Sequence, residues 1–404
     1  MRVLAAIIVP PHLSVSGGAR AGEALTAALT SRCEMHVASM MGGVGTDPEA
    51  TVRRVPVRTS LPFPAELGRA IPSRYRTPFY RSSIPDTVAR GGYDLVHIHN
   101  PTPALEMERV AAACARAGVP YVISTHGYNE VAHGHRVHGG GLMPLAWRRL
   151  AYSPVARATR GAAAVFALSP ADIPILHAMG VREGAVRVVP NGVPMPAPAD
   201  QAAIRAVRDR FGLGKDLPDR PLTCMFLGNH TPNKGLPVLL EAFRAIERPF
   251  RLVIGGDRRQ GIDYEGAVRA ARPGQQVVVT GRLSDGEVSA LMYLSDLFVF
   301  PTLADTFPLV VLEAMAHGLP VLATAVGGIP YMLGDDCGAL VAPGDPGAIA
   351  AAVERLATRP RRLSEMGDGA RARAKREFTW DRAASLAFAG YEAVLGRAPA
   401  LAAE

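Results

Sequence analysis

Cysteine is scarce in this 404-residue sequence, and the four that occur lie far apart. Cys33, Cys114, Cys224 and Cys337 form no Cys-x-x-Cys pair, so we expect buried free thiols in a reducing compartment rather than a disulfide-stabilised domain. No run of about 18 apolar residues occurs, which argues against a membrane-spanning helix. The apolar run near the N-terminus breaks at Pro10 and predicts a buried parallel strand rather than a signal peptide.

Lysine is also rare, and the basic character comes from arginine. The formal net charge is +8, and residues 1–195 carry all of it, with 20 Arg, no Lys and 12 acidic residues. In this half, five arginines from Arg69 to Arg90 are interspersed with aromatic residues. That mixture suits an anionic membrane surface or a phosphorylated acceptor, although a solvated face fits it as well. No recognition motif or long basic helix accompanies it, so we expect no nucleic-acid partner.

Motifs of several enzyme classes are missing from the sequence. The absence of Gly-x-Ser-x-Gly argues against serine hydrolysis, and the absence of Gly-x-Gly-x-x-Gly argues against a dinucleotide-dependent oxidoreductase. The loop that ends in Lys234 and Gly235 does not fit a P-loop, because Gly228 and Lys234 stand six residues apart and Gly follows the Lys. The function must therefore be inferred from other patterns.

Short apolar runs alternate with amphipathic stretches along most of the chain. This alternation predicts an α/β fold with parallel sheets covered by helices on both faces. Residues 194–200 contain three prolines in five positions and predict a linker. We therefore expect two doubly wound domains, at 1–195 and 196–378, followed by a helix and tail at 379–404. The helix, roughly 380–395, has an apolar stripe and is expected to pack back on the first domain.

Glycines and polar residues follow many of the predicted strands. Because ligands bind at the carboxyl ends of strands in open parallel sheets, we expect these residues to line a cleft between the two domains. The candidates are Gly17 and Gly18, His99, His126, Asn191, Gly228 to Gly235, Gly255 and Gly256, Gly281 and Arg282, Asp305 to Leu309, and Gly327 and Gly328.

Residues 301–328 carry the most informative pattern. Glu313 lies among apolar residues at helical spacing, so we expect its carboxylate to be withdrawn from water, which costs several kcal/mol unless the charge is paired. Two adjacent hydroxyls, such as those of ribose, can both donate to a carboxylate. Eight residues earlier, Asp305 and the free N–H groups of the helix start can face a second polyol and a phosphate. The alternative is a core helix whose Glu313 pairs with an arginine.

Two further turns suggest contacts with a ligand. Lys234 lies on a loop that enters a helix, where the ammonium group and the helix dipole favour a diphosphate, although a solvent-facing lysine is the alternative. Gly17 and Gly18 precede an amphipathic helix and allow a ligand to approach the backbone closely. A tight turn without a ligand explains the glycine pair almost as well.

Four histidines follow a predicted strand at 126–138, namely His126, His133, His135 and His138. A metal site is one interpretation, but no carboxylate or thiol at suitable spacing completes a ligand set, so we expect no metal. His126, directly after the strand, is better placed to hydrogen-bond a hydroxyl or carry a proton. The glycine run at 139–141 suggests a loop that orders over an acceptor.

Taken together, these residues resemble the retaining group 1 nucleotide-sugar glycosyltransferases (glycosyltransferase family 4), which have the GT-B fold of two facing Rossmann-like domains. The resemblance covers nearly the whole chain and is strongest from 222 to 345. It implies that Asp305 contacts the donor sugar and Glu313 the ribose. The donor-binding residues it implies are Gly17, Gly18, Asn229, Lys234, Gly281, Arg282, Leu283, Asp305, Thr306, Phe307, Pro308, Leu309, Val310 and Glu313.

The resemblance also implies a reaction. A sugar would move, with retention, from a nucleotide-diphosphate donor to a hydroxyl of a glycan, glycolipid or small molecule, with no cofactor or metal; Asp-x-Asp is absent. Lys234 and a helix N-terminus would stabilise the departing diphosphate. The catalytic candidates are His126, Lys234 and Asp305, and the acceptor-side candidates are His99, His126 and Asn129. We expect the protein in the cytoplasm or at the inner face of the membrane.

The sequence departs from the family pattern at two positions. Asp305 stands where the family usually has Glu, which shortens its reach, and Asn229 stands where Arg is usual, which removes one of two phosphate cations. These departures keep an alternative open: a non-catalytic nucleotide-sugar-binding protein or a degenerate transferase subunit.

Overall fold

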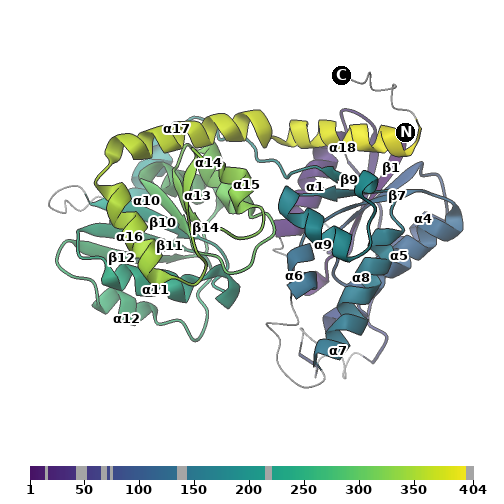
Figure 1. Ribbon diagram of the computed structural model, residues 1–404, viewed down its shortest axis with the longest axis horizontal. Coiled ribbons are helices and arrows are strands. Elements are labelled where there is room, and N and C mark those ends of the chain that lie inside the picture. Colours follow the sequence, from purple (N-terminus) through teal and green to yellow (C-terminus); the bar gives the residue numbers. More distant parts are fainter. Residues whose placement is uncertain are drawn as a thin grey trace. The chain divides into compact units, whose positions relative to one another are not determined.

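The computed structural model describes residues 1–13, 17–41, 52–64, 71–72, 76–133, 143–213 and 221–396. Within these residues the chain divides into two compact units (Figure 1). The first consists of the described parts of Met1–Gly192 and Trp380–Glu404, and the second is Val193–Thr379. Each unit is a parallel sheet with helices on both faces, so the predicted α/β fold with two doubly wound domains is confirmed.

The first unit contains a sheet with the strand order β3-β2-β1-β6-β7-β8-β9, parallel throughout. Its strands are β1 (Arg2–Ile7), β2 (Glu34–Ser39), β3 (Arg53–Arg54), β6 (Leu95–His99), β7 (Tyr121–Ser124), β8 (Ala164–Ala167) and β9 (Val186–Val188). A short antiparallel pair, β4 (Thr59–Ser60) and β5 (Arg81–Ser82), lies apart from it. In β1, residues 3–7 are fully buried, because helices cover both faces of a parallel sheet.

Two hydrophobic cores cover the faces of this sheet. The helices are α1 (Gly17–Leu29), α4 (Ile84–Ala89), α5 (Ala104–Ala117), α6 (Tyr128–His133), α7 (Met143–Trp147), α8 (Ser153–Arg160), α9 (Ile173–Ala178) and α18 (Trp380–Val394). One core gathers residues of α1 and α18, and the other gathers residues of α4, α5, α6, α8 and α9. At α18, Gly390 leaves room for the Phe166 ring, since an added Cβ would lie 2.6 Å from it. The last helix therefore packs on the first sheet, as predicted.

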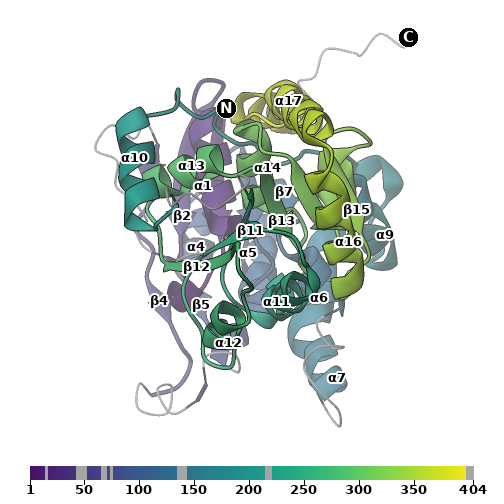
Figure 2. The same ribbon diagram turned by 90° about the vertical axis from the view of Figure 1, so that its left-hand side faces the viewer.

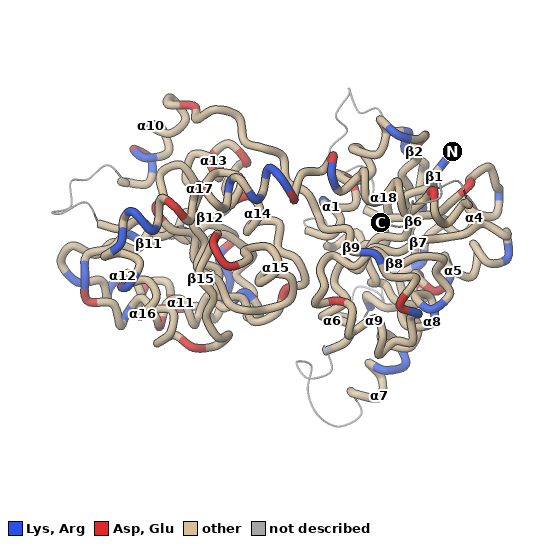
Figure 3. The backbone as a smooth tube through the Cα atoms, turned by 45° about the horizontal axis from the view of Figure 1, so that its top comes forward, with Lys and Arg blue, Asp and Glu red and all other residues tan. Residues whose placement is uncertain are grey.

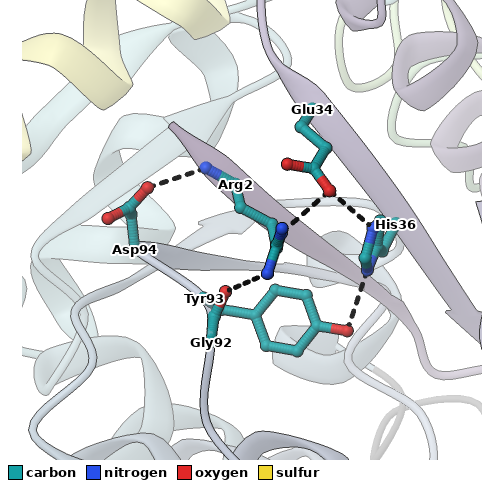
Figure 4. A network of polar contacts seen from close by, with 6 residues as sticks. All are labelled: Arg2, Glu34, His36, Gly92, Tyr93 and Asp94. Carbon is teal, nitrogen blue, oxygen red and sulfur yellow. Dashed lines mark hydrogen bonds and ion pairs between the residues drawn. The ribbon is translucent and has the colours of Figure 1, made fainter.

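A polar network closes the amino-terminal edge of the first sheet (Figure 4). Arg2 donates from its backbone N to Asp94 at 2.7 Å and from Nε to Glu34 at 2.8 Å. His36 lies 3.2 Å from the same carboxylate and 3.1 Å from the Tyr93 hydroxyl. The network joins the starts of β1 and β2 to the loop before β6. Parallel strands all begin at one edge, so this network lies at the edge opposite the carboxyl ends of the strands.

The second unit contains a parallel sheet with the order β12-β11-β10-β13-β14-β15 (Figure 2). Its strands are β10 (Leu222–Leu227), β11 (Phe250–Gly255), β12 (Gln275–Gly281), β13 (Leu297–Phe300), β14 (Val321–Thr324) and β15 (Gly338–Val341). Its helices are α10 (Gln201–Arg210), α11 (Leu236–Ala245), α12 (Tyr264–Arg269), α13 (Asp285–Leu294), α14 (Leu309–Ala316), α15 (Ile329–Leu333), α16 (Pro346–Ala357) and α17 (Pro360–Glu377). Helices α11 and α16 pack together, as do α14 and α17.

The helices of the second unit begin in two ways. Ser284 and Glu287 form a capping box at α13, and Asp345 caps α16 by accepting from Ala348 N at 2.8 Å. By contrast, α11 follows Gly235 and α14 follows Pro308, and neither has a side-chain cap. Among the described residues no side chain caps these two helices. Pro237 has no N–H and Val311 N donates to Pro308 O at 3.1 Å, so the remaining first-turn N–H groups are the ones that can meet an anion.

Candidate functional site

Lys234 and Asp305 form an ion pair at the carboxyl edge of the second sheet. Lys234 ends a short 3-10 turn (Pro232–Lys234) after β10, and Asp305 follows β13, the neighbouring strand. The Nζ–Oδ1 distance is 2.6 Å, and the two side chains are 20% and 14% exposed. The other carboxylate oxygen, Oδ2, accepts from Thr302 Oγ1 at 2.6 Å. The fold thus brings the predicted cation and the predicted acid into direct contact.

The two turns that carry this pair are joined through their backbones. Leu303 N donates to Asn233 O at 2.7 Å, and Thr302 Oγ1 donates to the same oxygen at 2.9 Å. Gly235 has a φ of +71°, and a Cβ there would lie 1.8 Å from Pro301 O. Only glycine combines this left-handed conformation with so close an approach, so residue 235 fixes the position of the lysine turn.

The loop after β14 holds the Asp305 turn from the other side. A Cβ at Gly327 would lie 2.0 Å from Asp305 O, and Gly328 N donates to Thr306 O at 2.7 Å. Thr306 is buried, and its Oγ1 has no hydrogen-bond partner among the described residues. Phe307 is also buried and packs edge-on against Phe378. These contacts set the direction in which α14 begins.

Helix α14 places Glu313 less deeply than the sequence predicts. Pro308 precedes its first turn, and Leu309, Val310 and Glu313 are all only partly buried. Glu313 is therefore less buried than the prediction of a carboxylate withdrawn from water implies. Helical periodicity identifies an apolar face, but it does not show whether other elements cover that face completely. The position of Glu313 on the helix that follows Asp305 is as predicted.

The turns after β10, β11 and β12 contact one another. A Cβ at Gly256 would lie 2.0 Å from Gly228 O, and Gly256 N donates to Gly281 O at 3.0 Å. Asn229 is exposed and so is Arg282, whereas Leu283 is partly buried. With the strand order β12-β11-β10-β13-β14, the predicted donor-side residues of this unit therefore follow one another along a single sheet edge.

His230 lies within the predicted Gly228–Gly235 turn, although the sequence analysis gave it no role of its own. It is buried, and its Nδ1 lies 2.6 Å from the Tyr264 hydroxyl while Nε2 lies 3.2 Å from Gly255 O. Burial lowers its pKa. The imidazole thus connects the turn after β10 to the turn after β11. Its place directly after Asn229, inside the glycine-to-lysine loop, was the available signal.

In the first unit, the predicted residues gather where β6 and β7 end. Gly18 lies in the first turn of α1, and a Cβ there would lie 2.3 Å from Asn100 Nδ2 and 3.2 Å from His126 Cβ. The rings of His99 and His126 are stacked with centroids 5.8 Å apart. Gly17 begins the same helix with open space around it. Asn129 lies in α6 and is partly buried.

The histidines of this group are deeply buried. His97 lies 2.6 Å from the Tyr391 hydroxyl and 2.8 Å from Ser124 Oγ, and its ring lies 3.9 Å from that of His99. Burial lowers the pKa of His97 to about 3, with a smaller contribution from His126. Burial lowers the pKa of His126 to about 4 and that of His99 well below its usual value. All three are therefore neutral at physiological pH.

Some predictions fall wholly or partly on residues that the structure does not describe. His135, His138, the glycine run at 139–141, Arg69 and Arg74 lie outside the described residues, and so does the side chain of His133. Over the described ranges, no three His, Cys, Asp or Glu side chains converge as a metal site. In the same part of the chain, no helix combines the length and apolar character that crossing a bilayer requires.

Two family models match the chain. One, described as Glycosyltransferase Family 4, matches residues 15–195, and the other, Glycosyl transferases group 1, matches residues 221–359. A D-inositol 3-phosphate glycosyltransferase of Streptomyces griseus is 32% identical over 333 residues, which cover 76% of this chain and 68% of that protein. The chain belongs to the group 1 glycosyltransferases. This glycosyltransferase is also 29% identical over 316 residues to 2-deoxystreptamine glucosyltransferase of Streptomyces kanamyceticus, with 75% and 78% of the two chains covered.

Solved structures share the fold of this glycosyltransferase. Anabaena HepE in complex with UDP-glucose matches it with a TM-score of 0.70 at 18% identity, over 96% of this chain and 98% of that chain. Sucrose-phosphate synthase from Thermosynechococcus elongatus matches with a TM-score of 0.71 at 20% identity, over 98% and 100% of the chains. The predicted GT-B fold, with its two Rossmann-like domains, is therefore confirmed.

Proposed function

We propose that this glycosyltransferase moves a sugar, with retention at the anomeric carbon and without a metal, from a nucleotide-diphosphate donor to an acceptor hydroxyl. The observation that carries the proposal is the ion pair between Lys234 and Asp305 beside two helix starts that lack capping side chains. An ammonium group and free backbone N–H groups favour the phosphates of such a donor. The acceptor is a glycan, a glycolipid or a small molecule.

The ion pair leaves both partners with spare hydrogen-bonding capacity. An ammonium group has three N–H donors, and Asp305 takes one of them, so Lys234 keeps two for phosphate oxygens. The Asp305 carboxylate accepts from Lys234 and Thr302 and can still accept from a hydroxyl of the donor sugar. Each group therefore orients the other while remaining able to bind substrate.

The remaining donor contacts follow the sheet edge. Glu313, partly exposed on α14, would accept hydrogen bonds from the ribose hydroxyls, and the backbone from Gly281 to Leu283 would contact the base. The turn from Thr306 to Val310 would offer backbone N–H groups to the sugar and phosphate, and the free Thr306 Oγ1 adds a further donor or acceptor.

Catalysis would depend on charge that develops on the diphosphate. As the glycosidic bond breaks, the leaving diphosphate becomes more negative, so Lys234 and the start of α14 would stabilise the transition state more than the ground state. The diphosphate would itself take the acceptor proton. Neutral His126 would hold a substrate hydroxyl, since burial keeps it uncharged.

A donor panel tests this proposal. UDP-glucose is the first donor to try, because the structure of HepE holds it. We expect at least one nucleotide sugar to raise the melting temperature and to yield product with D-inositol 3-phosphate, 2-deoxystreptamine or a host extract. The product should keep the donor's anomeric configuration by NMR, and turnover should persist in EDTA. If no nucleotide sugar protects the protein, the proposal is lost.

A non-catalytic nucleotide-sugar-binding role is the second candidate. Exposed Asn229, in place of the arginine expected from the family, favours it because only one phosphate cation remains in that loop. The same panel distinguishes the two functions. A binding protein would show thermal protection but neither product formation nor slow hydrolysis of the donor. A transferase would show product formation, donor hydrolysis or both.

A further inference from the structure

Four buried polar atoms at the end of β6 and β7 have no hydrogen-bond partner among the described residues. They are both ring nitrogens of His99, Oδ1 of Asn100 and Nε2 of His126. These residues are 1%, 8% and 4% exposed, respectively. Buried polar groups in folded proteins are nearly always hydrogen-bonded, so a cluster of this kind indicates that a ligand or bound water completes it.

The backbone around this cluster is held in a costly conformation. Asn100 has a φ of +71° and is the only described non-glycine residue with positive φ. The start of α1 fixes its carboxamide, because Gly18 approaches Asn100 Nδ2 so closely that a Cβ would lie 2.3 Å away. Gly22, one turn later, approaches the His99 ring, where a Cβ would lie 3.1 Å from Cγ. Two glycines of α1 thus set the positions of Asn100 and His99.

The chemistry of these groups indicates what they bind. Oδ1 of Asn100 only accepts hydrogen bonds, and a neutral imidazole offers one donor and one acceptor nitrogen. The strands β6, β7 and β8 carry no Lys, Arg, Asp or Glu (Figure 3). A hydroxyl can both donate and accept, so it suits every one of these atoms. A phosphate only accepts when fully ionised, and these three side chains bring no positive charge to offset its burial.

We propose that His99, Asn100 and His126 form a subsite for the hydroxyl groups of an uncharged sugar or cyclitol ring of the acceptor, and that Asn100 favours this ring over a phosphorylated one. The inference rests on the proposed function, since it names the acceptor class of that reaction. Asn100 is a specificity-determining residue in this scheme: it accepts a ring hydroxyl at Oδ1, and a phosphate oxygen in the same place would meet its lone pairs.

Ligand-observed saturation-transfer NMR on the full chain tests the subsite directly. The probes are myo-inositol, glucose and D-inositol 3-phosphate, each measured with UDP present. We expect at least one uncharged probe to bind more tightly than D-inositol 3-phosphate. Asn100→Gly should weaken its binding about tenfold, the effect of losing one hydrogen bond. Glycine adopts positive φ without strain, so this variant removes the carboxamide and keeps the backbone.

A second variant and a control complete the test. Gly22→Ala, which crowds the His99 ring, should weaken the same probe two- to fivefold. Gly184→Ala should change nothing, because its Cβ enters open space in the same unit. If no uncharged probe binds, if D-inositol 3-phosphate binds as tightly, or if Asn100→Gly binds like the parent, the subsite is refuted. UDP-glucose binding is measured in parallel: its absence defeats the proposed function, whereas its presence without probe binding defeats the subsite alone.

Discussion

The two units share one architecture but differ in how far the polar side chains at their sheet edges are hydrogen-bonded. In the second unit, Lys234, Asp305 and Thr302 satisfy one another through bonds of 2.6 Å. In the first unit, His99 and Asn100 lie buried with ring nitrogens and a carboxamide oxygen that have no partner among the described residues. Apart from Thr306 Oγ1, which is also buried without a hydrogen-bond partner among the described residues, the second edge is thus assembled before any ligand arrives, whereas the first edge awaits hydrogen-bond partners.

This difference matches the chemistry of two kinds of ligand. A site for a charged diphosphate needs an oriented cation, and an ion pair keeps Lys234 in place at little cost because both side chains retain some exposure. A buried group without a partner costs about 1–3 kcal/mol, which a stable fold can bear only at a few positions. In the first unit this cost falls on groups that would gain hydrogen-bond partners when an acceptor binds.

The glycines show the same contrast at the level of the backbone. In the second unit, Gly235, Gly256 and Gly327 each lie against a backbone oxygen, which an added Cβ would approach to 2.0 Å or less. In the first unit, Gly18 and Gly22 lie against the side chains of Asn100 and His99. The turns of the second edge are therefore locked to one another through their backbones, while in the first edge the close approach of α1 sets the positions of the Asn100 and His99 side chains.

Removing the charge of Lys234, the cation at the sheet edge of the second unit, should have the largest effect on catalysis. Lys234→Met leaves Thr302 as the hydrogen-bond partner of Asp305 and removes one positive charge that would stabilise the leaving diphosphate. We therefore expect kcat/KM to fall about 1,000-fold, or about 4 kcal/mol. Steady-state kinetics with a nucleotide sugar that gives turnover in the donor panel measure this loss. Lys375→Met is the matched control, since Lys375 is exposed on α17. Equal kcat/KM in the two variants would remove Lys234 from the mechanism.

Disrupting the close backbone contact between Gly235 and Pro301 at the same sheet edge should have the next largest effect, on stability. Gly235→Ala combines a positive φ with a Cβ 1.8 Å from Pro301 O, so we expect a loss of about 3 kcal/mol in unfolding free energy. Both tryptophans, Trp147 and Trp380, belong to the first unit. Urea unfolding followed by circular dichroism should therefore shift, while the tryptophan transition should stay in place.

Gly184→Ala is the control for Gly235→Ala. Gly184→Ala has open space around its Cβ and should stay within about 0.5 kcal/mol of the parent. If Gly235→Ala unfolds at the parent's urea concentration, the close approach of the two turns is not rigid. If the tryptophan transition moves by the same amount, the two units unfold together and the contrast in their rigidity cannot be assigned to one unit.

Acid should weaken the first unit. His97 and His126 have pKa values lowered to about 3 and about 4 by burial, and that of His99 is lowered well below the usual value. The unfolded chain takes up these protons below about pH 6.5 and the folded unit does not, so the stabilisation present above that pH is lost as the pH falls. Burial raises the pKa of Asp172 to about 6, so its protonation in the folded state opposes this loss.

The net result follows from the balance of these groups. Burial also raises the pKa of Glu106 and lowers that of His12 in this unit. The histidines outnumber the two carboxyls, so we expect the tryptophan-monitored unfolding free energy to drop by about 2 kcal/mol between pH 6.5 and 5.5. His126→Gln should reduce this pH dependence by roughly half, since one histidine contributes about 1 kcal/mol over this range. If the unfolding free energy does not change between pH 6.5 and 5.5, the histidines take up protons in the folded unit as well, and the inference that they are neutral there is wrong.

The second edge was easier to predict from sequence than the first. Lys234 and Asp305 each follow an apolar run, and adjacent parallel strands bring such positions together, so a local pattern sufficed. The role of Asn100 depends on a positive φ and on the approach of Gly18, which lies 82 residues away in the sequence. No local pattern encodes that contact. The burial of Glu313 could not be predicted for a related reason, since the extent to which other elements cover a helix face is a tertiary property.

The smallest expected effect tests whether the partnered and unpartnered groups of the first unit are separate. Tyr391→Phe removes the hydroxyl that lies 2.6 Å from His97 and keeps the ring beside Phe166. We expect a loss of about 1 kcal/mol in tryptophan-monitored stability and less than a twofold change in kcat/KM. His97 retains Ser124 at 2.8 Å, so its ring should keep its orientation. If Tyr391→Phe instead impairs acceptor binding as strongly as Asn100→Gly, the polar groups act as one network, and the unpartnered atoms are not a distinct subsite.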